Sequence, residues 1–290
     1  MKIMIIFICI FTLIILRKKY IDIENYTNKQ YDNTIVAAYF NVKGKRPSSD
    51  YYKFAKNFLK LKSPIVLYTS QDNYDRFMEL RGDLPIKIII QDFEDIYMWK
   101  MYKDKWIKHN DELDTYFVKC SPQLFAIWSN KVIWLEDAIN HNYFNTKYFQ
   151  YTDFGSLRYD NLPEDIINNY PVINKYEDDK ILISLIFNFD KGDFRIKNNI
   201  IGNFDDKDRI DGSSFGGSIN ACLKYRIEYE KILNLYFDND QFAGKDEAVI
   251  CSLILAQPEL FTLVKKSKPA WFYLQEYLSI NRSEYEIIKL

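Results

Sequence analysis

Residues 34–40, with the sequence TIVAAYF, begin the pattern that decides the fold class. Two more short apolar segments follow, IVLYT at 65–69 and IKIII at 86–90, and apolar residues at helical spacing lie between them at 50–61 and 72–81. Short apolar strands that alternate with helices are typical of a mainly parallel sheet flanked by helices on both faces. The sequence therefore predicts an α/β fold with a twisted, mainly parallel sheet.

The domain organisation follows from where this pattern starts. A chain of 290 residues is long enough for one large α/β domain, and we expect a single domain over 34–290. Residues 20–33 are polar and without periodicity, so they are interpreted as a linker. Residues 1–19 form a separate N-terminal segment, whose apolar part is expected to be a short helix.

That N-terminal segment has an unbroken apolar or small run at 3–16, followed by three basic residues at 17–19. As a helix it reaches about 21 Å, which is less than the roughly 30 Å hydrocarbon core of a bilayer. A retained anchor, a signal-peptide core and a start-site artefact are all open, and the lack of a small-residue cleavage site favours the anchor. We therefore expect a membrane-associated protein with a single N-terminal anchor.

The side of the membrane stays open. Basic residues after the apolar run favour a cytoplasmic body. Two Asn-x-Ser/Thr triplets, at Asn25 and Asn281, are compatible with a lumenal one.

Composition excludes several classes of function. The chain has 39 basic and 40 acidic side chains, so no overall field favours nucleic acid, and no nucleic-acid partner is expected. Its four cysteines show no CxxC spacing, which argues against a zinc ribbon or a disulfide framework. Only two histidines are present, which excludes a histidine-rich metal site. Neither histidine lies in a nucleophile motif, which argues against Ser-His-Asp or Cys-His catalysis.

The end of the first strand is the first candidate ligand site. In parallel sheets, ligands bind beyond the C-terminal ends of the strands, which is where Tyr39, Phe40, Asn41 and the basic loop 43–46 are expected. Arg46 in this loop is either a phosphate contact or part of a solvated turn. The loop KGKR lacks the spacing of a P-loop and of GxGxxG, which argues against ATP hydrolysis and dinucleotide binding.

A second candidate site is the segment YFQYTDFGSLR at 148–158. It places Asp153 at the end of an aromatic strand, and Gly155 permits a sharp turn. A carboxylate at such a position suits a contact between a cation and a diphosphate, although it also suits a simple turn cap. The Asp-Phe-Gly triplet is not a kinase signature, because no HRD loop or VAIK strand accompanies it.

The third candidate region is rich in glycine and acidic residues. Residues 212–218, GSSFGGS, are expected to open a helix at 220–235, where Gly216 and Gly217 allow close approach of a ligand or form a plain tight turn. Asp246 and Glu247 enter an apolar helix that continues to Leu255. Acidic residues in a first helical turn interact favourably with the helix dipole, and they are also positions for a general base.

In this order and spacing, the segments resemble the HtrL/YibB family of bacterial and viral proteins, whose members are similar to glycosyltransferase-A enzymes. The resemblance runs from about residue 34 to 264. The residues that carry it are TIVAAYFN, SPIVLYTS, KVIWLEDAINHNYFNTKYFQYTDFGSLR, SSFGGS and GKDEAVICSLILAQPELFTLV. It implies a single glycosyltransferase-A-like domain that moves a sugar from a nucleotide-sugar donor to a glycan, lipid or protein acceptor.

The resemblance also implies roles for single residues. The donor lies over the first half of the sheet, so the donor-binding residues are Tyr39, Phe40, Asn41, Arg46, Asp153 and Arg158. The acceptor lies over the second half, with Gly216 and Gly217 lining the sugar and Asp246 or Glu247 as the general base. Asp153 stands where related enzymes have an Asp-x-Asp motif for Mn²⁺ or Mg²⁺, although this chain supplies one carboxylate where two are usual.

Other interpretations of the same sequence are open. A catalytically inactive glycosyltransferase-like protein would bind sugar or partner proteins without turnover. A nucleotidyltransferase would need a glycine-rich activation loop, which the first strand region lacks. A purely structural membrane-associated protein would bind no nucleotide. The segment KSKPAW at 266–271 resembles a C-terminal tail that closes on the diphosphate, although the histidine expected before it is absent.

Overall fold

The computed structural model describes residues 30–43, 46–114, 120–205, 207–279 and 284–290. The apolar run at 3–16 lies outside these ranges, so the expected N-terminal helix and anchor remain predictions. Within the described ranges no helix combines the length and the hydropathy needed to cross a membrane.

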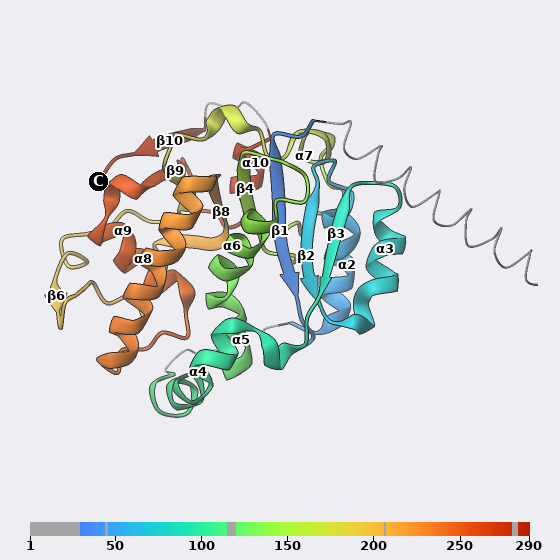
Figure 1. The fold of residues 1–290 in the computed structure, drawn as a ribbon. Coiled ribbons are helices and arrows are strands. Elements are labelled where there is room, and N and C mark those ends of the chain that lie inside the picture. The colour runs from blue at the N-terminus through green and yellow to red at the C-terminus, as the bar shows by residue number, and fades with distance from the viewer. Residues whose placement is uncertain (1–29, 44–45, 115–119, 206, 280–283) are drawn as a thin grey trace, which may run out of the picture.

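An eight-stranded mixed sheet organises the described chain (Figure 1), in the order β10-β9-β5-β8-β4-β1-β2-β3. Four neighbouring strands, β4, β1, β2 and β3, are parallel, as are β5 and β9. Strand β8 runs antiparallel between β4 and β5, and β10 runs antiparallel to β9 at the edge. The strands are β1 (Asn33–Tyr39), β2 (Ile65–Thr69), β3 (Ile86–Ile90), β4 (Tyr148–Thr152), β5 (Ile181–Leu185), β8 (Ile210–Ser218), β9 (Phe261–Lys266) and β10 (Tyr285–Ile288), with a separate hairpin of β6 (Ile196–Lys197) and β7 (Ile200–Ile201).

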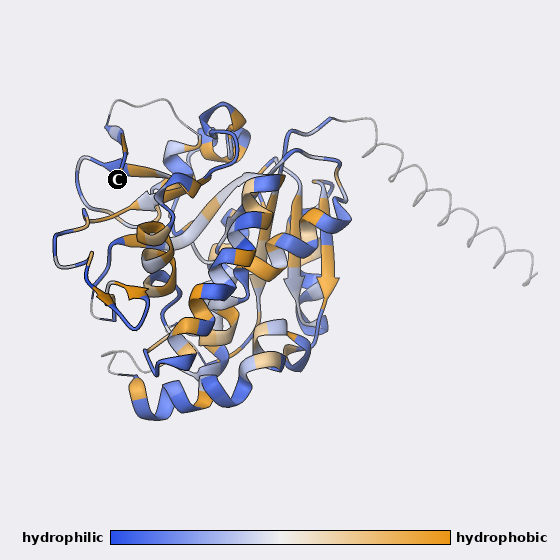
Figure 2. Cartoon of the chain, turned by 60° about the vertical axis from the view of Figure 1, so that its left-hand side comes forward, coloured by the Kyte–Doolittle hydropathy of each residue, from blue (hydrophilic) through white to orange (hydrophobic). Residues whose placement is uncertain are grey.

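Helices cover both faces of the sheet, because successive strand residues point to opposite sides. Val36 and Ala38 join one buried cluster, while Ile35 and Ala37 join another. The first cluster includes residues of α4 (Tyr97–Lys108), α5 (Pro122–Ser129), α6 (Lys131–His141), α8 (Ile219–Asp238) and α9 (Asp246–Ala256). The second includes residues of α2 (Ser48–Phe58), α3 (Tyr74–Arg81), α7 (Glu164–Asn169) and α10 (Leu274–Tyr277). Figure 2 shows the helices with mixed hydrophilic and hydrophobic surfaces, as expected for elements that bury one side.

Short helical turns complete the fold. They are the 3₁₀ turns Gln71–Asn73, Phe93–Asp95, Ile173–Lys175 and Pro258–Leu260 and the π-helical turn His109–Leu113.

The predicted alternation of strands and helices is confirmed for the described residues between 33 and 90. Strands β1, β2 and β3 lie within one residue of the predicted ranges, and α2 and α3 lie between them. Between the parallel strands β3 and β4, Asn130 separates α5 from α6, and its side-chain oxygen accepts a hydrogen bond from Met98 N at 3.0 Å.

The glycine-rich segment 212–218 is where the prediction was wrong. These residues are part of the strand β8 and not a loop, whereas the helix predicted after them is present as α8 and begins at Ile219, one residue before the predicted start. The glycines are needed because the neighbouring strands leave no room for a side chain. A Cβ on Gly216 would lie 2.3 Å from the Phe149 carbonyl oxygen, and one on Gly217 would lie 2.4 Å from that of Lys180.

Candidate functional site

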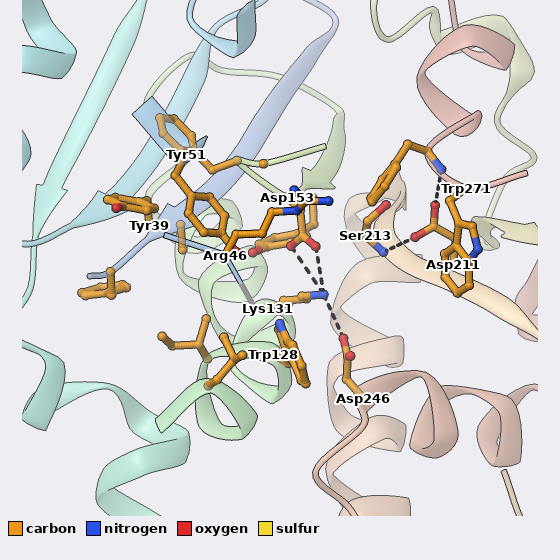
Figure 3. Close-up of a pocket in the computed structure, with 18 of the residues that line it drawn as sticks. Tyr39, Arg46, Tyr51, Trp128, Lys131, Asp153, Asp211, Ser213, Asp246 and Trp271 are labelled. Atoms are coloured by element: carbon orange, nitrogen blue, oxygen red, sulfur yellow. Dashed lines mark hydrogen bonds and ion pairs between the residues drawn. The ribbon is translucent and has the colours of Figure 1, made fainter. Parts of the chain in front are cut away.

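A cavity of about 790 Å³ opens at the C-terminal ends of β1 and β4 (Figure 3). Its walls come from six parts of the chain: the end of β1, the start of α2, helices α5 and α6, the segment after β4, the start of β8, and the start of α9. Trp271 and Phe272 close the remaining side. The C-terminal edge of a parallel sheet is the expected place for a ligand, and this volume suits a small-molecule site.

Most of the residues singled out from the sequence meet at this cavity. They are Tyr39, Phe40, Arg46, Asp153, Arg158, Asp246 and Glu247. Three others are elsewhere. Asn41 does not line the cavity, and its side-chain oxygen accepts a hydrogen bond from Ser48 Oγ at 2.9 Å. Gly216 and Gly217 lie inside β8, away from the cavity lining, so the structure gives them no place against a sugar.

The floor of the cavity is formed by a buried lysine between two carboxylates. Lys131 Nζ lies 3.4 Å from Asp153 Oδ1 and 2.9 Å from Asp246 Oδ2, and it donates to the Gly212 carbonyl oxygen at 2.9 Å. Figure 3 shows the ammonium group between the two acids. The Lys131 side chain is 4% exposed and that of Asp246 is 3% exposed. We call Lys131, Asp153 and Asp246 the lysine cluster.

Lys131 was not predicted from the sequence, although its position at the start of an apolar helix is unusual for a lysine. It begins α6 and stands within an apolar stretch. A cation in the first turn of a helix opposes the helix dipole, so it requires compensating partners nearby. Those partners, Asp153 and Asp246, come from distant parts of the chain, and the sequence alone does not show that they meet there.

Burial sets the protonation of this region. It raises the pKa of Asp153 to about 6, against the opposing effect of Lys131. Burial, together with the neighbouring Asp246 carboxylate, raises the pKa of Glu247 to about 8. Burial alone would lower the pKa of Lys131, but the attraction of Asp153 and Asp246 outweighs it and holds that pKa well above its usual value. Lys131 is therefore charged at every working pH.

Two glycines other than Gly216 and Gly217 matter in this region, each because a side chain would not fit. At Gly212, a Cβ would lie 3.1 Å from Glu247 Cγ and 3.3 Å from Asp246 Oδ2, so the bare backbone lets both acids approach β8. At Gly155, a Cβ would lie 2.9 Å from the Tyr51 ring. Gly155 is thus required for close packing, and it is not among the described residues with a left-handed backbone.

Two guanidinium groups also line the cavity. Arg46 has 45% of its side chain exposed, and the one ion pair that it forms with the described residues is a long one, 3.4 Å, to Asp50. Arg158 donates from Nε to the Gly155 carbonyl oxygen at 2.7 Å, and its guanidinium lies 4.3 Å from the ring centre of Phe272. Burial and the nearby Arg46 charge lower the pKa of Arg158. We call Arg46 and Arg158 the arginine pair.

The C-terminal segment is tied to the cavity through Asp211. This carboxylate accepts from Ser213 N at 2.9 Å and from Phe272 N at 2.7 Å, so both of its oxygens are engaged (Figure 3). Trp271 beside it is 43% exposed and lines the cavity. The KSKPAW segment noted in the sequence therefore leads to the cavity rim.

A resident divalent cation does not fit the residues present. Mn²⁺ and Mg²⁺ require several oxygen ligands at close range. The space between Asp153 and Asp246 holds the Lys131 ammonium, and both oxygens of Asp211 accept backbone hydrogen bonds. Across the described ranges, no group of three or more His, Cys, Asp or Glu residues is arranged to hold a metal. Two further acids of the lining are also paired, Asp50 with Arg46 and Asp208 with Lys245, which leaves the partly exposed Asp153 and Glu247 carboxylates for a cation.

No protein-family model matches the chain, and no curated protein matches it either. Similar solved structures include mouse xyloside xylosyltransferase 1 in its apo form, with a TM-score of 0.46 and 10% identity over 80% of this chain and 85% of that one. Core-mannan synthase A from Aspergillus fumigatus in an Mn/GDP form has a TM-score of 0.43 and 9% identity over 82% and 75%. The 4-diphosphocytidyl-2C-methyl-D-erythritol synthase from Anaerococcus prevotii has a TM-score of 0.31 and 11% identity over 78% and 98%. The resemblance to the HtrL/YibB family stays a prediction.

Proposed function

We propose that this chain is a glycosyltransferase that uses a nucleotide-sugar donor. The observation that supports it is the combination, in one cavity, of aromatic rings, the arginine pair and a carboxylate of raised pKa. A glycosyl transfer needs the same three elements: a surface for the nucleoside, positive charge for the diphosphate that leaves, and a base for the attacking hydroxyl.

The nucleoside would lie against the end of β1. Tyr39 lies in an aromatic cluster with Tyr51, at 5.4 Å between ring centres, and with Phe154 at 5.6 Å. Phe40 stacks on Trp134 at 5.6 Å. These rings are fixed by their neighbours, so a base can bind beside them without a large ordering cost.

The diphosphate would lie between the two members of the arginine pair. Guanidinium groups form paired hydrogen bonds with phosphate oxygens. Both guanidinium groups line the same cavity, and the Arg46 charge contributes, through repulsion, to the lowered pKa of Arg158. An anion placed between them removes that repulsion, which favours binding of a group with at least two negative charges.

Glu247 is the better placed of the two predicted bases. Asp246 is committed to Lys131 and almost fully buried, whereas Glu247 lines the cavity and is only half-buried. In an inverting reaction, the Glu247 carboxylate accepts the proton of the acceptor hydroxyl. The acceptor oxygen then bonds to the anomeric carbon, and the bond from that carbon to the diphosphate oxygen breaks, leaving the electron pair on the nucleoside diphosphate.

The acceptor would enter past the rim residues Trp128 and Trp271, both in the cavity lining. Indole rings bind the apolar faces of sugars, which suits a glycan, although a lipid or protein acceptor is equally compatible with an open rim. Membrane association would come from the apolar run at 3–16.

Turnover of the donor tests this function. The purified chain is incubated with UDP-, GDP- and CDP-sugars in turn, and release of the nucleoside diphosphate is measured. We expect release from one nucleotide class, reduced about 10²- to 10⁴-fold in Glu247→Gln because the base is removed. Glu79→Gln on the exposed side of α3 is the matched control and should keep full activity. Binding of a nucleotide sugar with no release from any donor would instead support the catalytically inactive alternative.

A further inference from the structure

The contacts of Lys131 account for all of its hydrogen-bonding capacity. An ammonium group has three protons, and Lys131 Nζ has three partners: Asp153, Asp246 and the Gly212 carbonyl oxygen. The side chain has almost no contact with solvent. Lys131 is therefore held in one position, at the junction of α6, the end of β4 and the start of α9.

The position of Lys131 is that of a bridging cation. It pairs with one carboxylate that faces the cavity, Asp153 at 32% side-chain exposure, and with one that is buried behind it, Asp246. A divalent ion bridging two acids would occupy the same space, and two cations there would repel each other. The ammonium therefore fills the position of such an ion and offsets one of the two negative charges that would attract it.

The arginine pair supplies this cavity with cations that do not depend on a metal. Guanidinium groups form paired, charge-assisted hydrogen bonds with phosphate oxygens, which is the contact that a metal ion would otherwise provide.

We propose that Lys131 takes the place of a divalent metal ion, so that the cavity binds the diphosphate of its nucleotide substrate without metal. The proposal rests on the function proposed above and adds the form of the ligand: a metal-free nucleoside diphosphate. Lys131 acts as a positioning residue. It holds the Asp153 and Asp246 carboxylates and offsets part of their repulsion of the phosphates, while Arg46 and Arg158 contact the phosphate oxygens.

Two titrations on the same protein test this proposal. In the first, UDP, GDP and CDP are titrated calorimetrically in excess EDTA and again in millimolar Mn²⁺. We expect the dissociation constant of the nucleotide that binds to agree within about threefold between the two conditions. An affinity about tenfold or more higher in Mn²⁺, equal to about 1.4 kcal/mol, would overturn the proposal.

In the second titration, Mn²⁺ alone is added to the wild type and to Asp153→Asn. Equal, weak uptake by both proteins supports the proposal, and tight uptake that disappears in Asp153→Asn contradicts it. This arm is independent of the proposed function. If no nucleotide binds in either condition, the glycosyltransferase assignment fails, while the Mn²⁺ titration still decides whether Lys131 excludes a metal.

Removal of the ammonium sharpens the result. Lys131→Met leaves Asp153 and Asp246 facing each other, so Mn²⁺ should now bind and raise the melting temperature in a concentration-dependent way. Lys131→Arg, which keeps the charge, should not acquire this response. Lys147→Met on the exposed surface is the matched control. A Mn²⁺ response equal in all three variants would contradict the proposal, and the wild-type titrations remain decisive if Lys131→Met does not fold.

Discussion

The lysine cluster and the arginine pair line the same cavity but differ in how the fold holds them. Lys131 and Asp246 are at most 4% exposed and satisfy each other within the protein. Arg46 is 45% exposed, and its only described ion pair is long. A buried ion pair that loses one partner leaves a charge without compensation, whereas an exposed arginine is solvated. We infer from this difference that the lysine cluster stabilises the structure of the site, whereas the arginine pair can bind a ligand.

Substitution of Glu247 is expected to have the largest effect on turnover, because Glu247 follows Asp246 of the lysine cluster and is the proposed base. Its pKa is raised to about 8, so below that pH it is mostly protonated and cannot accept a proton. Donor turnover in the wild type should therefore increase with pH up to about 8 and then level off. In Glu247→Gln the residual rate should be about 10²- to 10⁴-fold lower and without this rise, as measured by kcat/KM between pH 6 and 9. A profile that rises identically in both proteins would assign the base elsewhere.

Lys131→Met is expected to cause the largest loss of stability. Removal of one partner from a buried ion pair costs about 3–5 kcal/mol of unfolding free energy. The loss should depend on pH. Without the ammonium, the pKa of Asp153 rises further above its unfolded value, so protonation favours the folded variant. The deficit should therefore be largest above pH 7 and shrink as the pH falls through about 6, as measured by urea denaturation. A deficit that grows in acid would contradict the arrangement.

The arginine pair is expected to show the opposite behaviour. Arg46→Ala and Arg158→Ala should each change the unfolding free energy by less than about 1 kcal/mol, because the side chains are exposed or only partly covered. Each should weaken nucleoside diphosphate binding by about 10- to 100-fold, since a charge-assisted hydrogen bond contributes about 1.5–3 kcal/mol. Calorimetry of the two single variants and the double variant separates these effects. Unchanged affinity in all three variants would mean that the diphosphate does not bind at the arginine pair.

Two glycines of β8 provide a smaller test within a single strand. Gly216→Ala should destabilise the fold by about 1–3 kcal/mol, because its Cβ would meet the Phe149 carbonyl oxygen. Turnover of the folded fraction should be unchanged. Gly212→Ala should have less effect on stability but lower turnover, because its Cβ would press on Glu247. A loss of turnover in Gly216→Ala without a loss of stability would instead indicate that Gly216 contacts the ligand.

The parts of the site that the sequence predicted share one property. Asp153 follows a strand, Asp246 begins a helix and Arg46 lies in the loop between β1 and α2, and these positions follow from local periodicity. The parallel strands β1 to β3 were predictable for the same reason, because each has its own apolar run between turn residues.

The parts that the sequence missed depend on contacts between distant segments. Lys131 has its partners on other elements, and Asp211 accepts a hydrogen bond from Phe272 N, which is 61 residues away in the sequence. The glycines 216 and 217 were misinterpreted because a glycine that avoids a neighbouring strand has the same local sequence as one that forms a turn. Nothing in their immediate neighbours distinguishes the two cases.

A crystal structure with UDP or GDP bound, grown in EDTA, tests the central claim most directly. The account predicts the base beside Tyr39 and Phe40, the diphosphate between Arg46 and Arg158, and Lys131 still bridging Asp153 and Asp246. A nucleotide bound outside this cavity, or one whose phosphates avoid both arginines, would contradict it.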